Sequence, residues 1–157
     1  MREFYALHDG QDTDGQDTAG TALPNLMLLS LDEVVTTHRQ CRESLHDTDD
    51  LDADWPAIAR GQQAGEIAHM FLDAYVPFAE DGAGDYRIVD TRSGEHRGCV
   101  RAFGWEGADE VGPQFPSLAE YIDSVRRSLE TGEEHSYLVP RVDDGALFWE
   151  VDDSGRI

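Results

Sequence analysis

Three β-rich runs follow one another in the middle of the chain, with short glycine-containing segments between them. The runs are Tyr75–Phe78, Tyr86–Val89 and Cys99–Phe103. The segment EDGAGD predicts a turn after the first run, and TRSGEHRG predicts a hairpin between the second and the third. We therefore expect an antiparallel sheet at the centre of the fold.

A helix is predicted on the N-terminal side of these runs. Ser30 and Glu33 have the spacing of a capping box, in which each side chain accepts a hydrogen bond from the other residue's backbone amide. The helix is expected to reach about Leu45 and to follow a short strand at Leu26–Leu29. Its predicted buried stripe has helical spacing and consists of Leu31, Val34, Val35, His38, Cys41 and Leu45.

A second helix is predicted after the runs, and we expect it to lie across the sheet. Ser117 and Glu120 form another capping box, and Gly132 is the expected left-handed residue at the helix end. One face of this helix is apolar and carries Leu118, Ile122, Val125 and Leu129.

A further hairpin is predicted near the C-terminus. In YLVPRVDDGALFWEV, Asp144 and Gly145 stand between two apolar runs, and Pro140 favours an edge strand because it lacks a backbone N–H. Helices and strands are segregated along the chain rather than alternating. The sequence thus predicts one α+β domain over residues 1–157, with a mostly antiparallel sheet and helices packed against it.

The N-terminal segment REFYALHDG resembles the end of a helix. Phe4, Leu7 and His8 lie on one side of a helical turn, and Gly10 can stop it in the left-handed conformation. Because so short a helix is marginal without packing, we expect part of an N-terminal helix to be missing.

The pentapeptide DGQDT occurs twice in succession, at residues 9–13 and 14–18. An EF-hand loop with Gly15 at its invariant glycine position would place Gly10 and Thr21 where essential oxygen ligands are needed, so a calcium loop is excluded. Residues 9–20 are instead predicted to be a variable polar loop lengthened by duplication, which costs little closure entropy.

Charge limits the classes of partner. The chain has 33 acidic and 12 basic residues, a net charge of −21, and all its basic residues are arginine. A field of this sign repels nucleic acid and anionic lipid and attracts basic proteins. The same acidity is equally consistent with solubility or salt tolerance. The sequence shows neither a long apolar run nor a leader, so we predict a cytoplasmic protein with no membrane contact and reduced cysteines.

Two HxxC pairs supply the four ligands that a tetrahedral zinc site requires. They are His38 with Cys41 and His96 with Cys99. The first pair falls on the predicted apolar stripe of a helix and the second flanks a hairpin turn, where such residues ordinarily belong to a metal-free core. We therefore predict no metal and no other cofactor.

The sequence contains no GxSxG elbow, phosphate loop, HExxH motif or dinucleotide fingerprint, so we predict no catalytic residues. Asp81, Asp85 and Asp90 cluster in EDGAGDYRIVD. Aspartates in such positions usually cap their own turn, and this interpretation is favoured, although these three residues are also candidates to hold a cation or to receive an arginine from a partner.

Other candidate contacts lie in two acidic segments. Asp49 and Asp50 belong to the acidic link DTDDLDADW, residues 47–55, which has no periodicity and is predicted to be a loop. Trp105, in GWEGADEVG, is the tryptophan with the best prospect of being an exposed anchor, although burial is the commoner fate of this side chain. Trp149 lies in an alternating strand pattern and is expected to be packed.

The order of five segments resembles the SUKH superfamily, specifically its Smi/Knr branch of cell-wall-regulator-like domains. The segments are LHDGQ, LMLLSLDEVV, YVPFAEDGAGDYRIVD, GEHRGCVRAF and SLAEYIDSVRRSLETG. The most specific part is Pro77–Asp90, followed at a short distance by Gly98. In this sequence Tyr75 replaces a frequent tryptophan and Cys99 replaces the usual glutamine.

The resemblance implies an α+β domain that binds proteins and has no catalytic residues. Bacterial members of the superfamily are mostly regarded as immunity proteins against toxins, often nucleases, and fungal relatives regulate cell-wall synthesis. The implied function is a non-enzymatic immunity or adaptor protein for a basic partner such as a nuclease-type toxin. The alternatives are a regulatory protein without a toxin partner and a small metal-dependent enzyme.

Overall fold

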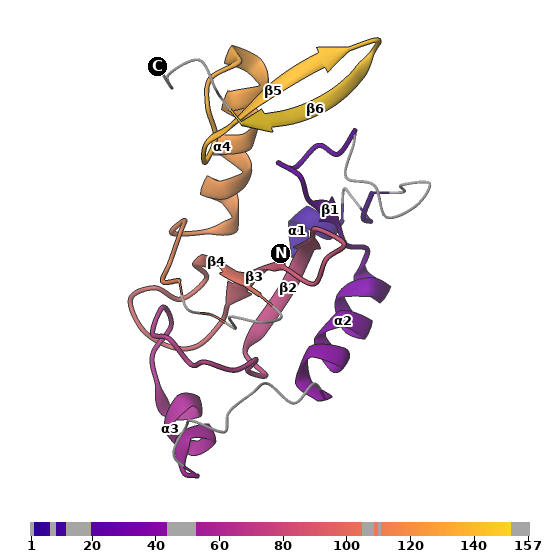
Figure 1. The fold of residues 1–157 in the computed structure, drawn as a ribbon. Helices are drawn as coiled ribbons and strands as arrows, with labels where there is room; N and C mark the ends of the chain where they lie inside the picture. The colour runs from indigo at the N-terminus through magenta and orange to yellow at the C-terminus, as the bar shows by residue number, and fades with distance from the viewer. Residues whose placement is uncertain are drawn as a thin grey trace.

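A computed structural model of the chain describes residues 2–6, 9–11, 20–43, 53–104, 109 and 111–151. Its helices are α1 (Arg2–Tyr5), α2 (Leu31–Glu43), α3 (Trp55–Gly61) and α4 (Leu118–Thr131). Its strands are β1 (Met27–Leu28), β2 (Tyr75–Glu80), β3 (Tyr86–Asp90), β4 (Val100–Phe103), β5 (Leu138–Asp143) and β6 (Ala146–Val151). Figure 1 shows α4 beside the β5–β6 hairpin at the top and α3 at the bottom.

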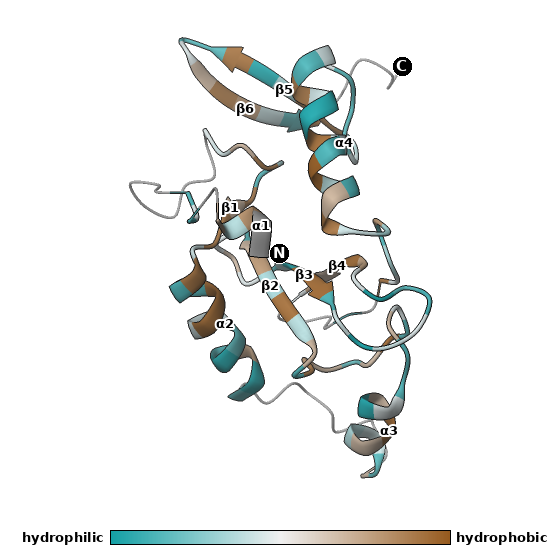
Figure 2. Cartoon of the chain, turned by 180° about the vertical axis from the view of Figure 1, so that it is seen from behind, coloured by the Kyte–Doolittle hydropathy of each residue, from teal (hydrophilic) through white to brown (hydrophobic). Residues whose placement is uncertain are grey.

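The central sheet contains β1, β2, β3 and β4 in this order, and every neighbouring pair is antiparallel. The predicted antiparallel centre is confirmed, as is the α+β class. A bulge between Pro77 and Ala79 shifts the register of β2 against β3. As a result Phe78 and Ala79, which are neighbours in sequence, belong to the same hydrophobic core. Figure 2 shows hydrophobic residues in β2 and β3, and hydrophobic and hydrophilic residues mixed along α2.

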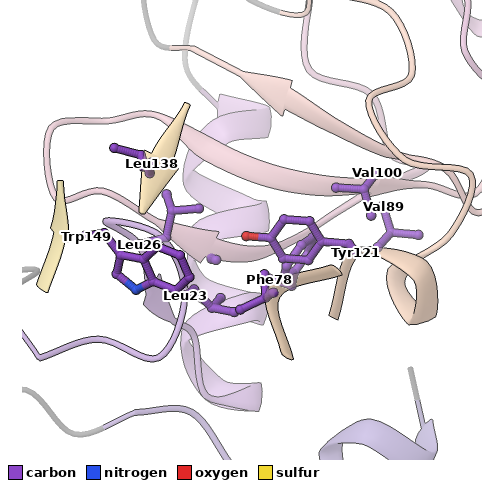
Figure 3. Close-up of a cluster of buried hydrophobic side chains, with 10 residues drawn as sticks. Leu23, Leu26, Phe78, Val89, Val100, Tyr121, Leu138 and Trp149 are labelled. Atoms are coloured by element: carbon purple, nitrogen blue, oxygen red, sulfur yellow. The ribbon is translucent and has the colours of Figure 1, made fainter. Parts of the chain in front are cut away.

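One face of the sheet packs against α4 and the β5–β6 hairpin. The strands contribute Phe78, Val89 and Val100, and the ring of Tyr121 lies 5.7 Å from that of Phe78. The buried members of this core, most of them labelled in Figure 3, are Leu23, Leu26, Phe78, Ala79, Val89, Val100, Tyr121, Val125, Leu138 and Trp149.

The opposite face packs against α2, α3 and the segment before β2. Ile88 belongs to this second core, whereas the next residue, Val89, belongs to the first. Successive residues of a strand point to opposite faces, so the two cores lie on either side of the sheet. The buried members of the second core are Cys41, Ala59, Ala68, Phe71, Leu72, Tyr75, Ile88 and Phe103.

The predicted caps of the long helices are present. The Ser30 amide donates to Glu33 at 2.7 Å and the Glu33 amide donates to the Ser30 hydroxyl at 3.3 Å, which is the complete capping box of α2. At α4 the Glu120 amide donates to the Ser117 hydroxyl at 3.2 Å. Gly132 ends α4 with a φ of 73° and donates its amide to the Ser128 carbonyl.

The predicted stripe of α2 is only partly correct. Val34, Thr37 and Cys41 are buried, but Leu31 is 49% exposed and Val35 is 57% exposed. These two residues, of the five predicted members that the structure describes, are exposed because the buried face is rotated about the helix axis toward Thr37. Leu45 lies outside the described residues.

The apolar face predicted for α4 is also shifted. Val125 is buried as expected, but the other fully buried residues of the helix are Tyr121 and Ser128, and Leu129 is 41% exposed. Leu118 and Ile122 are half-buried and pack at the edge of the core.

The C-terminal hairpin is confirmed and forms a separate two-stranded sheet. Asp144 has a φ of 48° and Gly145 a φ of 81°, as the two central residues of a type I′ turn require. Pro140 pairs with Trp149, and Trp149 is buried as predicted. The Gly20 amide donates to the Leu147 carbonyl at 2.8 Å along the other edge of β6.

Helix α3 was not predicted, because Trp55 was assigned to the acidic link. Asp54 precedes this helix and Pro56 stands in its first turn, a pairing that does favour a helix start. The Trp55 indole nitrogen donates to the Ala68 carbonyl at 2.6 Å, which joins α3 to the segment before β2. The described helices include none that is both long and apolar enough to cross a membrane.

A buried network of charged groups lies on the second face of the sheet. Arg101 of β4 is completely buried and is paired with Asp90 at 3.4 Å and with Asp109 at 3.2 Å. Its guanidinium also donates to the carbonyl groups of Glu66 and Val111. Arg101 therefore joins the sheet to two segments that have no regular structure.

Both carboxylates of this network are completely buried and accept several hydrogen bonds. Asp109 accepts from the Ala68 and His69 amides and, at 2.6 Å, from the Tyr75 hydroxyl. Asp90 accepts from the Gly65 amide and the Arg92 guanidinium. Burial alone would raise the pKa of Asp90, but the hydrogen bonds from Arg92 and Gly65 outweigh burial and lower it.

We predict that Arg101→Leu lowers the free energy of unfolding by about 3–5 kcal/mol, because it leaves the buried Asp109 carboxylate without its cation, whereas Asp90 keeps Arg92. Urea denaturation of the full chain measures this change. Arg126→Leu is the matched control, because Arg126 forms exposed ion pairs with Asp123 and Glu130 on α4. Equal losses in the two variants would contradict a special role for the buried network.

Candidate functional site

A cleft of about 340 Å³ opens between the sheet and the C-terminal hairpin. One wall comes from the β2–β3 turn, and the other from residues 135–138 and Val151. The floor contains Phe115 and Tyr121. The residues that line the cleft are Pro24, Asn25, Leu26, Asp81, Asp85, Arg87, Gln114, Phe115, Tyr121, His135, Ser136, Tyr137, Leu138 and Val151.

The cleft brings together two of the aspartates that the sequence suggested as partner contacts. Asp81 is half-buried, and its Oδ1 accepts hydrogen bonds from the Ala83 amide at 2.7 Å and the Asp85 amide at 3.0 Å. The favoured interpretation, that Asp81 caps its own turn, is confirmed. Asp85 is exposed, and its carboxylate has no hydrogen-bond or ion-pair partner among the described residues.

The third turn aspartate is placed differently. Asp90 is completely buried and belongs to the Arg101 network on the other face of the sheet. It is the last residue of β3 and has the same parity as Ile88, so its side chain points into the second core. Asp90 is therefore removed from the proposed contact surface. Asp49, Asp50 and Trp105 lie outside the described residues, as do most of the DGQDT repeat and residues 7–8.

Three aromatic rings form a rigid inner wall of the cleft. His135 stacks on Phe115 with ring centroids 5.5 Å apart and an interplanar angle of 2°. Tyr121 meets both rings edge to face, at 5.1 Å from Phe115 and 5.6 Å from His135. Tyr121 is 2% exposed and His135 is 4% exposed, so neighbouring side chains fix both rings.

The Tyr121 hydroxyl has no hydrogen-bond partner within the described part of the chain. Figure 3 shows it pointing toward Leu26 and Leu138, which both line the cleft. Burial raises the pKa of Tyr121 to about 12, and the nearby Arg87 opposes that shift. The hydroxyl is thus protonated at neutral pH and able to donate or accept a hydrogen bond.

Besides its two aspartates, the cleft contains two side chains that can carry positive charge, Arg87 and His135. Arg87 is half-buried and has no ion-pair partner among the described residues. Burial lowers the pKa of His135, and the positive charge of Arg87 lowers it further. The imidazole is therefore neutral at pH 7, with its Nδ1 at 3.0 Å from the Ser124 hydroxyl.

A strained turn presents Tyr137 at the rim of the cleft. Ser136 has a φ of 49° and Tyr137 a φ of 66°, a left-handed conformation that favours glycine or asparagine. Hydrogen bonds between the backbones of His135 and Leu138, at 2.7 and 3.0 Å, close the turn. The Tyr137 amide donates to Glu134 at 2.8 Å, and the Tyr137 side chain is 65% exposed.

The cysteines of the two HxxC pairs are used for packing, whereas His38 is half-buried and His96 is exposed. Cys41 and Cys99 are free and buried, and burial raises the pKa of Cys41 to about 11 and raises that of Cys99. His38 Nε2 lies 3.2 Å from the Asp73 carbonyl. The described residues contain no group of three or more histidine, cysteine or acidic side chains arranged to hold a metal ion.

The sequence did not reveal His135, Tyr137 or Tyr121 as cleft residues. The segment HSYL lacks the Asn-Gly or Asp-Gly pair that marks a two-residue hairpin turn, so its tight turn has no local signature. For Tyr121 the sequence did contain a signal, because this residue lies three positions after Leu118 and four before Val125, the spacing of one helix face.

Comparison with protein-family models supplies the affiliation of this domain. The model described as "SMI1 / KNR4 family (SUKH-1)" matches residues 1–124. The chain belongs to the SMI1/KNR4 family. The resemblance found from the sequence is thereby confirmed. The family match ends inside α4, so the SMI1/KNR4 part supplies the Asp81–Arg87 wall of the cleft and the hairpin after it supplies the other wall. A search of curated proteins found no match.

We predict that Tyr137→Gly raises the free energy of unfolding by about 0.5–1 kcal/mol. Glycine removes the cost of the left-handed conformation, roughly 1–2 kcal/mol, and part of that gain is offset by its greater freedom in the unfolded chain. Urea denaturation measures the difference. Leu138→Gly, at the adjacent buried position, should destabilise instead, and a stability loss in Tyr137→Gly would show that the exposed ring supports the fold.

We predict that stability falls as the pH decreases from about 7 to 5, and that His135→Gln reduces this dependence. The folded-state pKa of His135 lies below its unfolded value, so its contribution is present above about pH 6.5 and is lost as the pH falls toward the folded pKa. Denaturant unfolding at several pH values measures the slope.

His38→Gln should also reduce this pH dependence, because the pKa of His38 is likewise lowered by burial and by Arg42, so the two single variants separate the contributions of the two histidines. Asp90 titrates in a more acidic range, since its pKa is lowered. Identical slopes for wild type and His135→Gln would contradict the prediction.

Proposed function

We propose that this SMI1/KNR4-family protein is a non-enzymatic binding module, acting as an immunity or adaptor protein that neutralises a basic toxin. The observation that carries the proposal is a cleft in a domain of this family that is open to solvent and lined by Asp81 and Asp85. A nuclease is a suitable toxin, because an enzyme that binds nucleic acid needs a basic surface, and an acidic protein complements it.

Long-range charge supports this role. The net charge of −21 attracts a basic protein and speeds its encounter with this chain, an effect that salt screens. Contacts at the cleft would then fix orientation, as complementary charges do in protein interfaces. Asp49, Asp50 and Trp105 are proposed as additional contacts, and the cytoplasm is the proposed location.

Capture experiments test this function. The tagged full chain, expressed in its native cell, should retain a basic polypeptide that mass spectrometry identifies. A toxin encoded beside the gene supports immunity, whereas a host protein involved in growth or wall synthesis indicates the regulatory alternative. Turnover of a substrate by the purified protein, lost on a single substitution that preserves the fold, would contradict the binding role.

Charge reversal tests the proposed surface. Asp85→Arg should weaken binding of the captured partner roughly five- to tenfold and slow its association, because it changes a rim charge. Asp49→Arg with Asp50→Arg tests the acidic link in the same way. Glu95→Arg is the matched control, because Glu95 is exposed in the β3–β4 connection, away from the cleft residues. An association rate that is independent of salt would contradict electrostatic docking.

A further inference from the structure

The Ser136–Tyr137 turn combines a strained backbone with an exposed ring. Two successive residues other than glycine adopt positive φ, although asparagine or glycine would remove the strain. Core packing does not explain the choice of tyrosine, because the Tyr137 side chain is 65% exposed. The conformation holds an aromatic ring at the rim of the cleft, and tyrosine is among the residues that contribute most to binding energy at interfaces.

The backbone that carries the Tyr137 ring is held in place before any partner binds. The turn is closed by hydrogen bonds between His135 and Leu138, and Glu134 accepts from the Tyr137 amide. His135 is in turn stacked on Phe115 in the buried aromatic wall. Because the backbone that carries Tyr137 is already ordered, binding there loses less conformational entropy than binding to a mobile loop.

A free carboxylate lines the same cleft from the β2–β3 turn. Asp85 is exposed and has no partner in the described part of the chain, whereas Asp81 is engaged with two backbone amides. An aromatic face and a carboxylate at one cleft suit a guanidinium group. Its plane stacks on the ring while its edge donates hydrogen bonds to the carboxylate.

A second group directed at a ligand lies deeper in the cleft. The Tyr121 side chain is only 2% exposed. Its hydroxyl is directed toward the cleft residues Leu26 and Leu138 and has no partner among the described residues. Arg87 also lines the cleft, and its positive charge repels a cationic group of a ligand from the floor. The floor therefore suits an uncharged acceptor, such as a backbone carbonyl group that accepts from the Tyr121 hydroxyl.

We propose that the cleft binds an arginine of the partner protein, with the guanidinium held between the Tyr137 ring and the Asp85 carboxylate at the rim. The partner's backbone next to this arginine lies over the Tyr121 hydroxyl. This inference rests on the proposed function, because it names the side chain by which a basic partner is recognised. Charge complementarity with the strongly acidic chain selects this occupant over an acidic peptide or a second copy of the protein.

Titration of the isotope-labelled full chain with Nα-acetyl-arginine amide, followed by NMR, tests the site. We expect saturable shifts of the Asp85, Tyr137 and Leu138 amides at millimolar ligand. The uncharged isostere Nα-acetyl-citrulline amide should produce much smaller shifts. Equal shifts with both ligands, or shifts that do not saturate and spread over the acidic surface, would overturn the proposal.

Single substitutions distinguish the contribution of the Tyr137 ring to binding from that of the Asp85 charge. Tyr137→Ala and Asp85→Asn should each weaken binding of the arginine derivative by about fivefold, and Tyr137→Phe should retain it because the ring remains. Both side chains are exposed, so the spectra of folded variants are expected to keep their dispersion. Unchanged affinity in Tyr137→Ala or in Asp85→Asn would overturn the assignment.

The outcome also separates this inference from the proposed function. If the captured partner binds Tyr137→Ala and wild type equally, the arginine site is wrong while the binding function stands. If no polypeptide is captured but the arginine derivative still saturates the cleft, the binding site stands and the proposed function fails. Sedimentation that shows a dimer dissociated by Tyr137→Ala would identify a second copy as the occupant and would overturn the proposal.

Discussion

The bridge that Arg101 makes between two buried carboxylates determines how the domain is assembled. Removing three charged groups from water is costly, and the cost is offset only because nearly every hydrogen-bonding position is satisfied. Asp109 joins the bridge to the segment before β2, and Asp90 joins it to Gly65 in that segment and to Arg92 at the start of the β3–β4 connection. Segments that lack regular structure are thereby attached to one face of the sheet.

The opposite face is left for α4 and the hairpin, and this division explains the position of the cleft. Tyr121 and His135 complete the core on that face, and the same two side chains form the inner wall of the cleft. The core and the cleft therefore share a rigid aromatic group. The SMI1/KNR4 match stops within α4, so the segment that carries His135 and Tyr137 lies outside the matched residues.

Local patterns were sufficient to predict most of the elements, with α3 as an exception, and they were insufficient where the contact depends on distant residues. The capping box at Ser30 and the turn at Asp144 are specified by neighbours in sequence, and both were found. The pairing of Arg101 with Asp90 requires strand register, which no short motif encodes. Alternation along β3 did contain a usable signal, because Asp90 shares the parity of Ile88 and so belongs inside.

The candidate site shows the same limit. Asp81 and Asp85 were identified because turn aspartates are recognisable, and the structure adds that they line a cleft. Tyr137 was missed because its turn contains neither glycine nor asparagine. The expected stripe of α2 included Val35, which is exposed, because periodicity gives the spacing of a face but not the rotation of the helix about its axis.

Pro140 reduces the tendency of the C-terminal hairpin to pair edge to edge with strands of other molecules. Its pair with Trp149 has the same parity as the pair of Val142 with Leu147, and the Leu147 carbonyl points away from β5 to accept from Gly20. By this alternation the nitrogen of Pro140 faces the outer side of β5, where it offers no hydrogen. The outer edge of β6 is thus paired with Gly20 of the same chain, and the outer edge of β5 lacks a hydrogen-bond donor at Pro140. Both features discourage the addition of further strands and the growth of fibrils.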